Sequence, residues 1–532
     1  MSGILLAVLG ACFLIGGYFT YGRLASRVFG VSDANPTPAV SKRDGVDYVP
    51  ARNWVVLFGH HFSSIAGAGP IVGPIVALMA WGWLPALAWV LGGTVFAGGV
   101  HDLGSLVLSL RRGGTSISEA SEAVISRWAR VMFSVFVLLA LLLVVAVFAV
   151  LAAESMVAVP AVIPPAVGLI PVAVLVGLLL YRTNLPSWFG TLVGLLSLAG
   201  LLFLGSVWKF PTGPTWVWIA GLFVYAFFAS TLPVQYLLQP RDYISAFLLF
   251  VGLLLGYIGI FVSHPRVNAH AFVGFLPKEG PLWPMLFVTV ACGAISGFHS
   301  LIASGTTSKQ LPRELQAQRI GYGAMVSEAL LSVMVIVMVS TLGFGAAGNP
   351  ITVFGKAYDL SVPFLGGYAG AFGVIILNAF ILTTLDTATR IGRYVFSELT
   401  GIGNRWLATG IVIVPAALLA FTGSWKVIWP LFGSANQLTA ALALLVITSW
   451  LLATRKPCWI TLIPAIFMLF TTIAALVWQA WVFARSLLAN PVMNSVLLLI
   501  TILLLGLSVA MSVMAFASWT KRKLEKPQPS TP

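Results

Sequence analysis

The sequence predicts an all-α polytopic membrane protein, and three observations lead to this fold class. Only 8% of the 532 residues are charged and 59% are hydrophobic, whereas a soluble globular chain carries about 25% charged residues. Apolar stretches of spanning length recur along the whole chain, and the longest polar stretch, about 23–53, is too short to form a domain core. Two apolar stretches are interrupted by proline and glycine, a pattern typical of inverted-repeat transporters. We therefore expect about fifteen transmembrane helices in a five-plus-five inverted repeat with extra N- and C-terminal helices.

Each predicted helix is a stretch of about 20 mostly apolar residues, the length that crosses the hydrocarbon core of a bilayer. In chain order the stretches are 2–22, 54–80, 84–110, 127–152, 162–181, 187–207, 215–238, 243–263, 284–304, 321–345, 363–389, 405–423, 429–452, 458–484 and 493–519. The first has no basic segment before its apolar run, so we expect a retained helix and not a cleaved signal peptide.

The basic residues predict the orientation of these helices. Most of the 29 Lys and Arg residues lie in loops that follow odd-numbered stretches or in the C-terminal tail. Lys and Arg collect in cytoplasmic loops. This distribution predicts an N-terminus outside the cell and a C-terminus in the cytoplasm.

Two of the predicted helices carry residues that interrupt a helix. Stretch 54–80 contains Gly67-Ala68-Gly69-Pro70, and stretch 215–238 contains Pro233 among polar residues. Unwound backbone is tolerated in a membrane only where it faces protein or a water-filled cavity. A simple proline kink is the alternative in each case. The two stretches are five spans apart, and this odd offset reverses their orientation, so they predict corresponding positions in two inverted halves.

The predicted organisation has five parts. These are an N-terminal helix and cytoplasmic loop (1–53), a first five-helix repeat (54–207), a second five-helix repeat (215–393), additional C-terminal helices (405–519) and a cytoplasmic tail (520–532).

Composition excludes several other classes of protein. The net charge of +14 is explained by cytoplasmic loops, and no basic run interleaved with aromatic residues predicts a nucleic-acid partner. Cys12, Cys292 and Cys458 lie far apart in apolar stretches and have neither disulfide nor metal-ligand spacing. We expect no metal site and no cofactor, and no feature of the sequence predicts an oligomeric state.

Several motifs resemble those of the carbon starvation protein A family. They stand in the family's order between about 47 and 438, beginning with Asp47-Tyr48-Val49-Pro50 and Leu57-Phe58-Gly59-His60-His61-Phe62. The others are Ile65-Ala66-Gly67-Ala68-Gly69-Pro70, Leu238-Gln239-Pro240-Arg241-Asp242-Tyr243, Cys292-Gly293-Ala294-Ile295-Ser296-Gly297-Phe298-His299-Ser300, Thr383-Thr384-Leu385-Asp386-Thr387-Ala388-Thr389-Arg390 and Leu431-Phe432-Gly433-Ser434-Ala435-Asn436-Gln437-Leu438.

This resemblance implies a function and a fold. It implies a transporter of the bacterial inner membrane, linked to carbon starvation, that imports peptides or pyruvate. It also implies the LeuT-like five-plus-five fold of the amino acid–polyamine–organocation superfamily. The expected partners are a small-molecule substrate and the lipid bilayer.

A carboxylate is common to pyruvate and to a peptide terminus, and backbone N–H groups at the start of a half-helix would bind it. The glycines of the first break allow such a close approach. A histidine beside the break could carry a coupling proton, with a histidine hydrogen-bonded inside the bundle as the alternative. Adjacent helical residues diverge by about 100°, so only one of the two histidines can face the cavity. The substrate-binding residues predicted in this way are His60, His61, Gly67, Ala68, Gly69, Ser230, Gln235 and Tyr236.

The resemblance also suggests where a coupling ion, Na⁺ or H⁺, would bind. In the superfamily the eighth core helix faces the first and often supplies hydroxyl groups to sodium. We assign that position to stretch 284–304 and the residues that follow it, although hydroxyl-rich helices also pack tightly for purely structural reasons. The candidate residues are Ser296, His299, Ser300, Ser304 and Thr306.

The remaining charges are expected at cytoplasmic helix ends, as gates or as static interfacial pairs. The gating candidates are Arg241, Asp242, Asp386 and Arg390. Asp386 and Arg390 stand at i, i+4, so part of their pairing is expected within one helix. Glu328 lies in an apolar stretch with no obvious partner.

Two other functional classes remain as alternatives. An intramembrane metal-dependent enzyme would use His60 and His61, but no His-Glu-x-x-His motif is present. A channel would need a pore-loop filter, and no such signature is visible. The absence of a Gly-x-x-x-x-Gly-Lys-Ser/Thr motif argues against ATP-driven transport by this chain.

Overall fold

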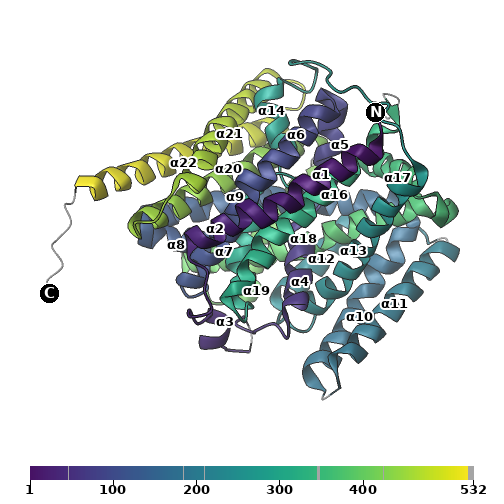
Figure 1. Ribbon diagram of the computed structural model, residues 1–532, viewed down its shortest axis with the longest axis horizontal. Helices are drawn as coiled ribbons and strands as arrows, with labels where there is room; N and C mark the ends of the chain where they lie inside the picture. The colour runs from purple at the N-terminus through teal and green to yellow at the C-terminus, as the bar shows by residue number, and fades with distance from the viewer. Residues whose placement is uncertain (46, 184, 209, 344–347, 423–424, 525–532) are drawn as a thin grey trace.

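The computed structural model shows an all-helical bundle (Figure 1). It describes residues 1–45, 47–183, 185–208, 210–343, 348–422 and 425–524. Within these ranges eleven helices are long and apolar enough to cross a membrane. A twelfth span is formed by α4 (Trp54–Ile65) and α5 (Gly69–Trp81), which are bent by 41° at the break between them.

The long helices are α1 (Gly3–Gly17) continuing to α2 (Arg23–Phe29), α6 (Trp83–Gly93) continuing to α7 (Gly99–Arg111), α9 (Arg127–Ala158), α10 (Ile163–Arg182), α11 (Ser187–Val207), α13 (Leu238–Ser263), α16 (Gly323–Ser340), α18 (Ala369–Thr400), α20 (Trp425–Ala453), α21 (Trp459–Arg485) and α22 (Pro491–Leu524). Short helices α3 (Pro38–Ser41), α8 (Ile117–Val124) and α17 (Pro350–Ser361) connect them.

The expected fifteen spans are therefore reproduced only in part. Stretches 215–238 and 405–423 form the shorter helices α12 (Thr215–Thr231) and α19 (Arg405–Thr422). Stretch 284–304 is divided into α14 (Leu282–Thr289) and α15 (Gly297–Gly305). Hydropathy counts apolar length, and it does not show whether the backbone remains helical over that length.

Two long helices form the centre of the bundle. α9 and α18 contain 32 residues each and pack along one another. The Ser126 hydroxyl begins α9 by accepting a hydrogen bond from the Ala129 amide at 3.1 Å, which replaces a missing intrahelical partner. The almost fully buried α20 packs against α9 and completes this centre.

The hairpin of α10 and α11 lies at the edge of the bundle (Figure 1). The two helices pack mainly against each other, and most α11 side chains are at least partly exposed. This hairpin stands between α9 and α12 in the chain, so it adds two spans that do not belong to the packed centre.

The second break is not where the sequence suggested. α12 ends at Thr231 and α13 begins at Leu238, so Pro233 lies in the turn between two helices. The second interrupted helix is instead α14–α15, where residues 290–296 are not helical. A proline ends a helix as readily as it interrupts one, and the local sequence does not distinguish the two outcomes.

Candidate functional site

The two interrupted helices meet at their breaks. A Cβ atom built on Gly69 would lie 2.3 Å from the Cβ of Cys292, which stands in the α14–α15 break. A Cβ on Gly73 would lie 2.6 Å from the carbonyl oxygen of Thr289, the last residue of α14. Only glycine permits this approach, so the two breaks form one closed contact in the interior of the bundle.

The carbonyl groups at the end of α4 are bound by α18. The break removes their usual i+4 partners, since the Gly67 amide bonds to Ile65. The Thr383 hydroxyl donates to the Ser63 carbonyl at 2.6 Å, and the Thr384 hydroxyl donates to the Ser64 carbonyl at 3.1 Å. These adjacent hydroxyl groups therefore stabilise the unwound segment.

We expect Thr383→Val to destabilise the protein by about 1–3 kcal/mol, because the Ser63 carbonyl would lose a buried donor. Thr383→Ser keeps the hydroxyl group and should remain closer to the wild type. Thermal unfolding of the two purified variants in detergent measures the difference. Equal stability of the valine and serine variants would show that the hydroxyl does not support the break.

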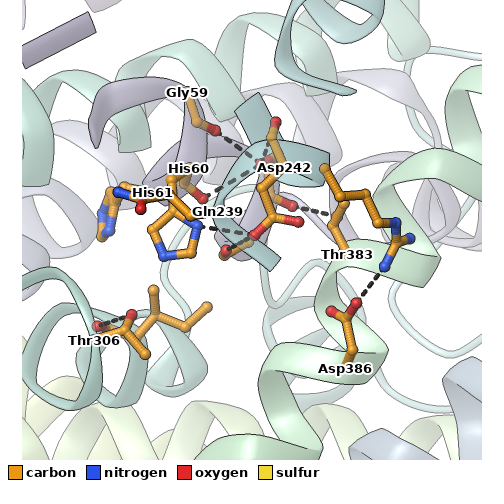
Figure 2. Close-up of polar contacts among 12 residues, drawn as sticks. Gly59, His60, His61, Gln239, Asp242, Thr306, Thr383 and Asp386 are labelled. Carbon is orange, nitrogen blue, oxygen red and sulfur yellow. Dashed lines mark hydrogen bonds and ion pairs between the residues drawn. The ribbon is translucent and has the colours of Figure 1, made fainter. Parts of the chain in front are cut away.

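The two adjacent histidines of α4 have different partners, and Figure 2 shows the contact of His60 with Asp242. His60 Nδ1 lies 2.8 Å from Asp242 Oδ2, and the Gln310 amide nitrogen lies 3.2 Å from His60 Nε2. A carboxylate accepts and an amide N–H donates, so this pairing favours the neutral Nδ1–H tautomer of His60. His61 Nδ1 lies 2.8 Å from the Thr307 hydroxyl. The two imidazoles therefore have no shared partner that would define a common site.

Arg241 and Asp386 form a buried ion pair between α13 and α18 (Figure 2). The Tyr225 hydroxyl donates to the same carboxylate oxygen at 2.7 Å, and Arg241 also bonds to that hydroxyl. Asp242 bonds to His60 instead of Arg241. The expected local pairing of Asp386 with Arg390 is therefore wrong, because Asp386 pairs across helices with Arg241.

Arg390 belongs to a separate group at one end of the bundle. Its Nε donates to the Tyr394 hydroxyl at 2.9 Å, and one Nη donates to the Leu232 carbonyl at 2.8 Å. The other Nη lies 3.6 Å from Asp47 Oδ1. The side chain is only 2% exposed, so this group joins α18, the α12–α13 turn and the 47–53 segment.

At the other end of the α4–α5 pair lies a cavity of about 390 Å³. It is lined by the last turns of α5, by Met285 and Thr289 of α14, and by the starts of α17 and α20. The region around the two breaks therefore has two different ends. The Arg241–Asp386 and Arg390–Asp47 pairs close one end, and the cavity lies at the other.

Comparison with known proteins identifies the family of this chain. The family model described as "Carbon starvation protein CstA" matches residues 2–364 and 353–475. The "Peptide transporter CstA" of Bacillus subtilis (strain 168) is 32% identical over 98% of both chains. The chain belongs to the CstA family.

Other relatives support this assignment. The "Peptide transporter CstA" of Escherichia coli (strain K12) is 32% identical over 89% of this chain and 81% of its own length. The "Pyruvate/proton symporter BtsT" of the same strain is 29% identical over 85% of this chain and 78% of its own length. These relatives are named as transporters, so this CstA-family protein is a membrane transporter and not an enzyme.

A solved structure with a similar fold is the manganese transporter of Eremococcus coleocola. It has a TM-score of 0.56 and 14% identity, and the match covers 91% of this chain and 99% of the transporter. At this identity the likeness shows the fold alone, and it confirms a LeuT-like architecture for the CstA-family chain.

Three of the predicted substrate residues lie away from the paired breaks. Ser230 donates to the Phe227 carbonyl of its own helix at 3.1 Å. Gln235 donates to the Gly45 carbonyl at 3.0 Å, and the Tyr236 hydroxyl accepts from Arg182. The prediction of these three residues depends on a helix break at Pro233, but in the structure Pro233 lies in the turn between α12 and α13.

The predicted hydroxyl ligands do not converge on one point. Three of them donate to carbonyl groups of their own segment: Ser300 to Gly297 at 2.7 Å, Ser304 to Ser300 at 2.6 Å and Thr306 to Ile302 at 3.1 Å. Ser296 contacts Asn436 on α20. The hydroxyl groups that face the first break are those of Thr383 and Thr384, on a different helix from the one the sequence suggested.

His299 has a partner that sequence reasoning missed. Its Nε2 lies 3.1 Å from Glu328 Oε2, and its Nδ1 lies 2.8 Å from Asp102 Oδ2. The expectation that Glu328 has no partner is therefore wrong. These residues come from three helices, and nothing in their local sequence predicts the contact.

Within the described ranges, no group of three or more His, Cys, Asp or Glu residues has the geometry of a metal site. His60 and His61 in particular bind separate partners. The arrangement gives no support to the alternative of a two-histidine metal centre.

Proposed function

We propose that this CstA-family protein is a secondary active transporter of the bacterial inner membrane, importing peptides or pyruvate during carbon starvation with a proton or sodium gradient. The observation that carries the proposal is the contact between the two helix breaks at Gly69 and Cys292. Broken helices that meet in the interior are typical of substrate sites in secondary transporters. The names of the relatives support peptides and pyruvate as substrates and the proton as coupling ion.

The substrate carboxylate would bind at the start of α5 when the two breaks separate. Pro70 stands at the second position of α5, a place where its missing N–H removes no helical hydrogen bond. The amides of Ala68 and Gly69 then remain as N-terminal donors. The helix dipole and these donors favour a carboxylate at this position. Gly67 supports the same segment, because a Cβ there would lie 2.5 Å from Phe148.

Alternating access would follow from opening the closed end of the site. The Arg241–Asp386 and Arg390–Asp47 pairs hold α18 against α13 and the 47–53 segment. We place this end in the cytoplasm and the cavity of about 390 Å³ at the outer surface. This orientation agrees with the positive-inside distribution, with the N-terminus outside, the C-terminus inside and fifteen crossings when the interrupted and short helices are included.

The repeat boundaries follow from the position of the second break. We propose a first half of α4–α5, α6–α7, α9, α12 and α13, with α10 and α11 as an inserted hairpin. The second half is then α14–α15, α16, α18, α19 and α20, in place of the expected 215–393. Supporting this pairing, α9 and α18 are both 32 residues long, occupy the third place in each half and pack together.

A second candidate for the coupling ion is sodium, and one observation favours it. The hydroxyl oxygens of Thr383 and Thr384 lie beside the carbonyl oxygens of Ser63 and Ser64. Hard cations prefer such oxygen ligands, although here the hydroxyl groups already donate to the carbonyl groups.

Uptake by reconstituted protein tests the function. In proteoliposomes with an inward gradient of one pH unit, we expect labelled pyruvate or a labelled dipeptide to accumulate up to about tenfold, since one pH unit is 1.36 kcal/mol per proton. A sodium gradient at constant pH is the parallel arm. Saturable uptake that ignores both gradients would contradict secondary active transport, and product formation would indicate an enzyme.

A further inference from the structure

Four buried titratable side chains form a continuous chain beside the paired breaks. His101 Nδ1 lies 2.8 Å from Asp102 Oδ1, both on α7. The other oxygen of Asp102 lies 2.8 Å from His299 Nδ1 on α15, and His299 Nε2 lies 3.1 Å from Glu328 on α16. All four side chains are 0% exposed. Three helices therefore contribute to one row of ionisable groups inside the membrane.

This row lacks a fixed positive charge to balance it. In the salt bridges of the described residues, Asp102 and Glu328 pair only with histidine. Consider the state in which both carboxyl groups are ionised, His299 is an imidazolium and His101 is neutral. In that state the row carries one net negative charge. A net charge buried in the membrane is costly, and one added proton makes the row neutral.

The row also has free capacity for that proton. Both Glu328 oxygens and His101 Nε2 are buried without a hydrogen-bond partner among the described residues. The His299–Glu328 contact is close, but its orientation does not make a hydrogen bond. Buried polar atoms are normally satisfied, so these exceptions point to a site that changes its occupancy.

We propose that the row of His101, Asp102, His299 and Glu328 is the proton-binding site that couples proton movement to substrate transport. The inference rests on the proposed function and adds to it the identity of the coupling residues. One proton binds at a Glu328 oxygen or at His101 Nε2 from the outer side, and the same proton is released to the cytoplasm. No covalent bond other than this N–H or O–H bond forms or breaks.

The row is connected to the breaks by two helices. His299 is the third residue of α15, directly after the second break. Glu328 lies one turn before Ser332, whose hydroxyl donates to the Pro70 carbonyl at the start of α5 at 3.0 Å. Separation of the two breaks would therefore move His299 and Glu328 relative to each other and change their affinity for a proton.

Two further titratable groups face this row from neighbouring elements. Cys292 from the α14–α15 break interacts electrostatically with Glu328 and Asp102. His61 from α4 interacts with Asp102 and His299. Neither brings a fixed positive charge, so the charge of the row depends on its own protons.

The other buried histidine–carboxylate pair, His60 and Asp242, is less suited to this role. Both nitrogens of His60 already have partners, Asp242 and the Gln310 amide. A second proton on this ring would lose the hydrogen bond from Gln310. Asp242 Oδ1 also has no hydrogen-bond partner among the described residues, but Asp242 interacts with the fixed cation of Arg241, which the row of four lacks.

The test compares Glu328→Gln with the matched control Glu314→Gln, whose carboxylate pairs with Arg111 at a helix end. Each protein is reconstituted, and the probe is whichever of labelled pyruvate or a labelled dipeptide the wild type accumulates. Two assays separate coupling from translocation: exchange of labelled for unlabelled substrate at equal pH, and uphill uptake driven by one pH unit. An internal pH dye records proton entry.

We expect Glu328→Gln to retain exchange within about threefold of wild type, while accumulation falls from about tenfold to about onefold and substrate-dependent proton entry disappears. Glu314→Gln should retain both activities. Uphill uptake by Glu328→Gln at the wild-type level would overturn the proposal. It would also be overturned if Asp242→Asn lost coupling while Glu328→Gln kept it.

If Glu328→Gln loses exchange as well, Asp102→Asn is tested by the same two assays. Retained exchange without accumulation in that variant supports the proposal. Loss of exchange in both variants overturns it, because the row would then have a structural role and no role in coupling. Failure of the proposed function is distinguishable, because the wild-type protein itself would then show no gradient-driven uptake.

Discussion

Gly69→Ala should reduce substrate uptake by at least about tenfold and lower the free energy of unfolding by about 1–3 kcal/mol, the usual range for overpacking a buried contact. The added methyl group would lie 2.3 Å from the Cys292 Cβ and 2.4 Å from its Sγ. No rotamer change relieves this contact, because the Cβ position is fixed by the backbone. The two breaks would be forced apart in the closed state.

The contact can be restored from the opposite side. In Gly69→Ala/Cys292→Gly, the nearest atom of residue 292 is the Cα, at 3.5 Å, which is ordinary van der Waals contact. We expect the double variant to recover most of the uptake lost in Gly69→Ala. Comparison with Cys292→Gly alone gives the coupling between the two positions.

Gly92→Ala on α6 is the matched control, because a Cβ there meets no atom within 4 Å. It should leave uptake unchanged and slightly favour the helix. Uptake by proteoliposomes and thermal unfolding in detergent are measured for all four variants. Wild-type uptake by Gly69→Ala, or no recovery in the double variant, would show that the paired breaks are not the site.

The first break was predictable because its cause is local. Two prolines and several glycines stand within one apolar stretch, and the structure interrupts the helix between Ile65 and Gly69. Glycines also stand at the second break, with Gly293 inside it and Gly297 as the first residue of α15, but Pro233 is the more conspicuous signal in the sequence. Pro233 stands five spans after the first break, and an offset of five is what an inverted repeat of five helices predicts. The hairpin α10–α11 is inserted between the halves' matching helices, so the two interrupted helices are in fact seven apolar stretches apart.

The pairing of charges was not predictable for a different reason. Arg241 and Asp386 are 145 residues apart, and Asp102 and His299 are 197 apart. Hydropathy places each residue at an approximate depth, but it does not give the rotation of its helix. Since neighbouring positions differ by about 100° around a helix, contact partners depend on the tertiary packing. The sequence therefore identified His299, Arg241 and Asp386 as unusual without identifying their partners.

The same buried pair leads to the second large effect. Asp386→Asn should abolish uptake and lower the free energy of unfolding by about 3–5 kcal/mol, because Arg241 would remain charged without its buried partner. The Tyr225 hydroxyl, which donates to the same carboxylate at 2.7 Å, would keep only a neutral amide oxygen as its acceptor, and this is a weaker acceptor than a carboxylate. Asp359→Asn, an exposed carboxylate on α17, is the control and should change neither property.

Loss of uptake in Asp386→Asn does not by itself separate a gate from a structural pair, but replacing the whole group does. Arg241→Met/Asp386→Leu/Tyr225→Phe removes every polar group of the pair, and such apolar replacements are often neutral or stabilising. If the pair only holds helices together, this triple variant should regain both stability and uptake. If the pair must break and re-form in each cycle, stability returns but uptake does not, because the closed and open states lose the interaction that distinguishes them. We expect the second result: thermal unfolding near that of the wild type, with uptake still reduced at least about tenfold, which corresponds to an activation free energy of transport higher by about 1.4 kcal/mol.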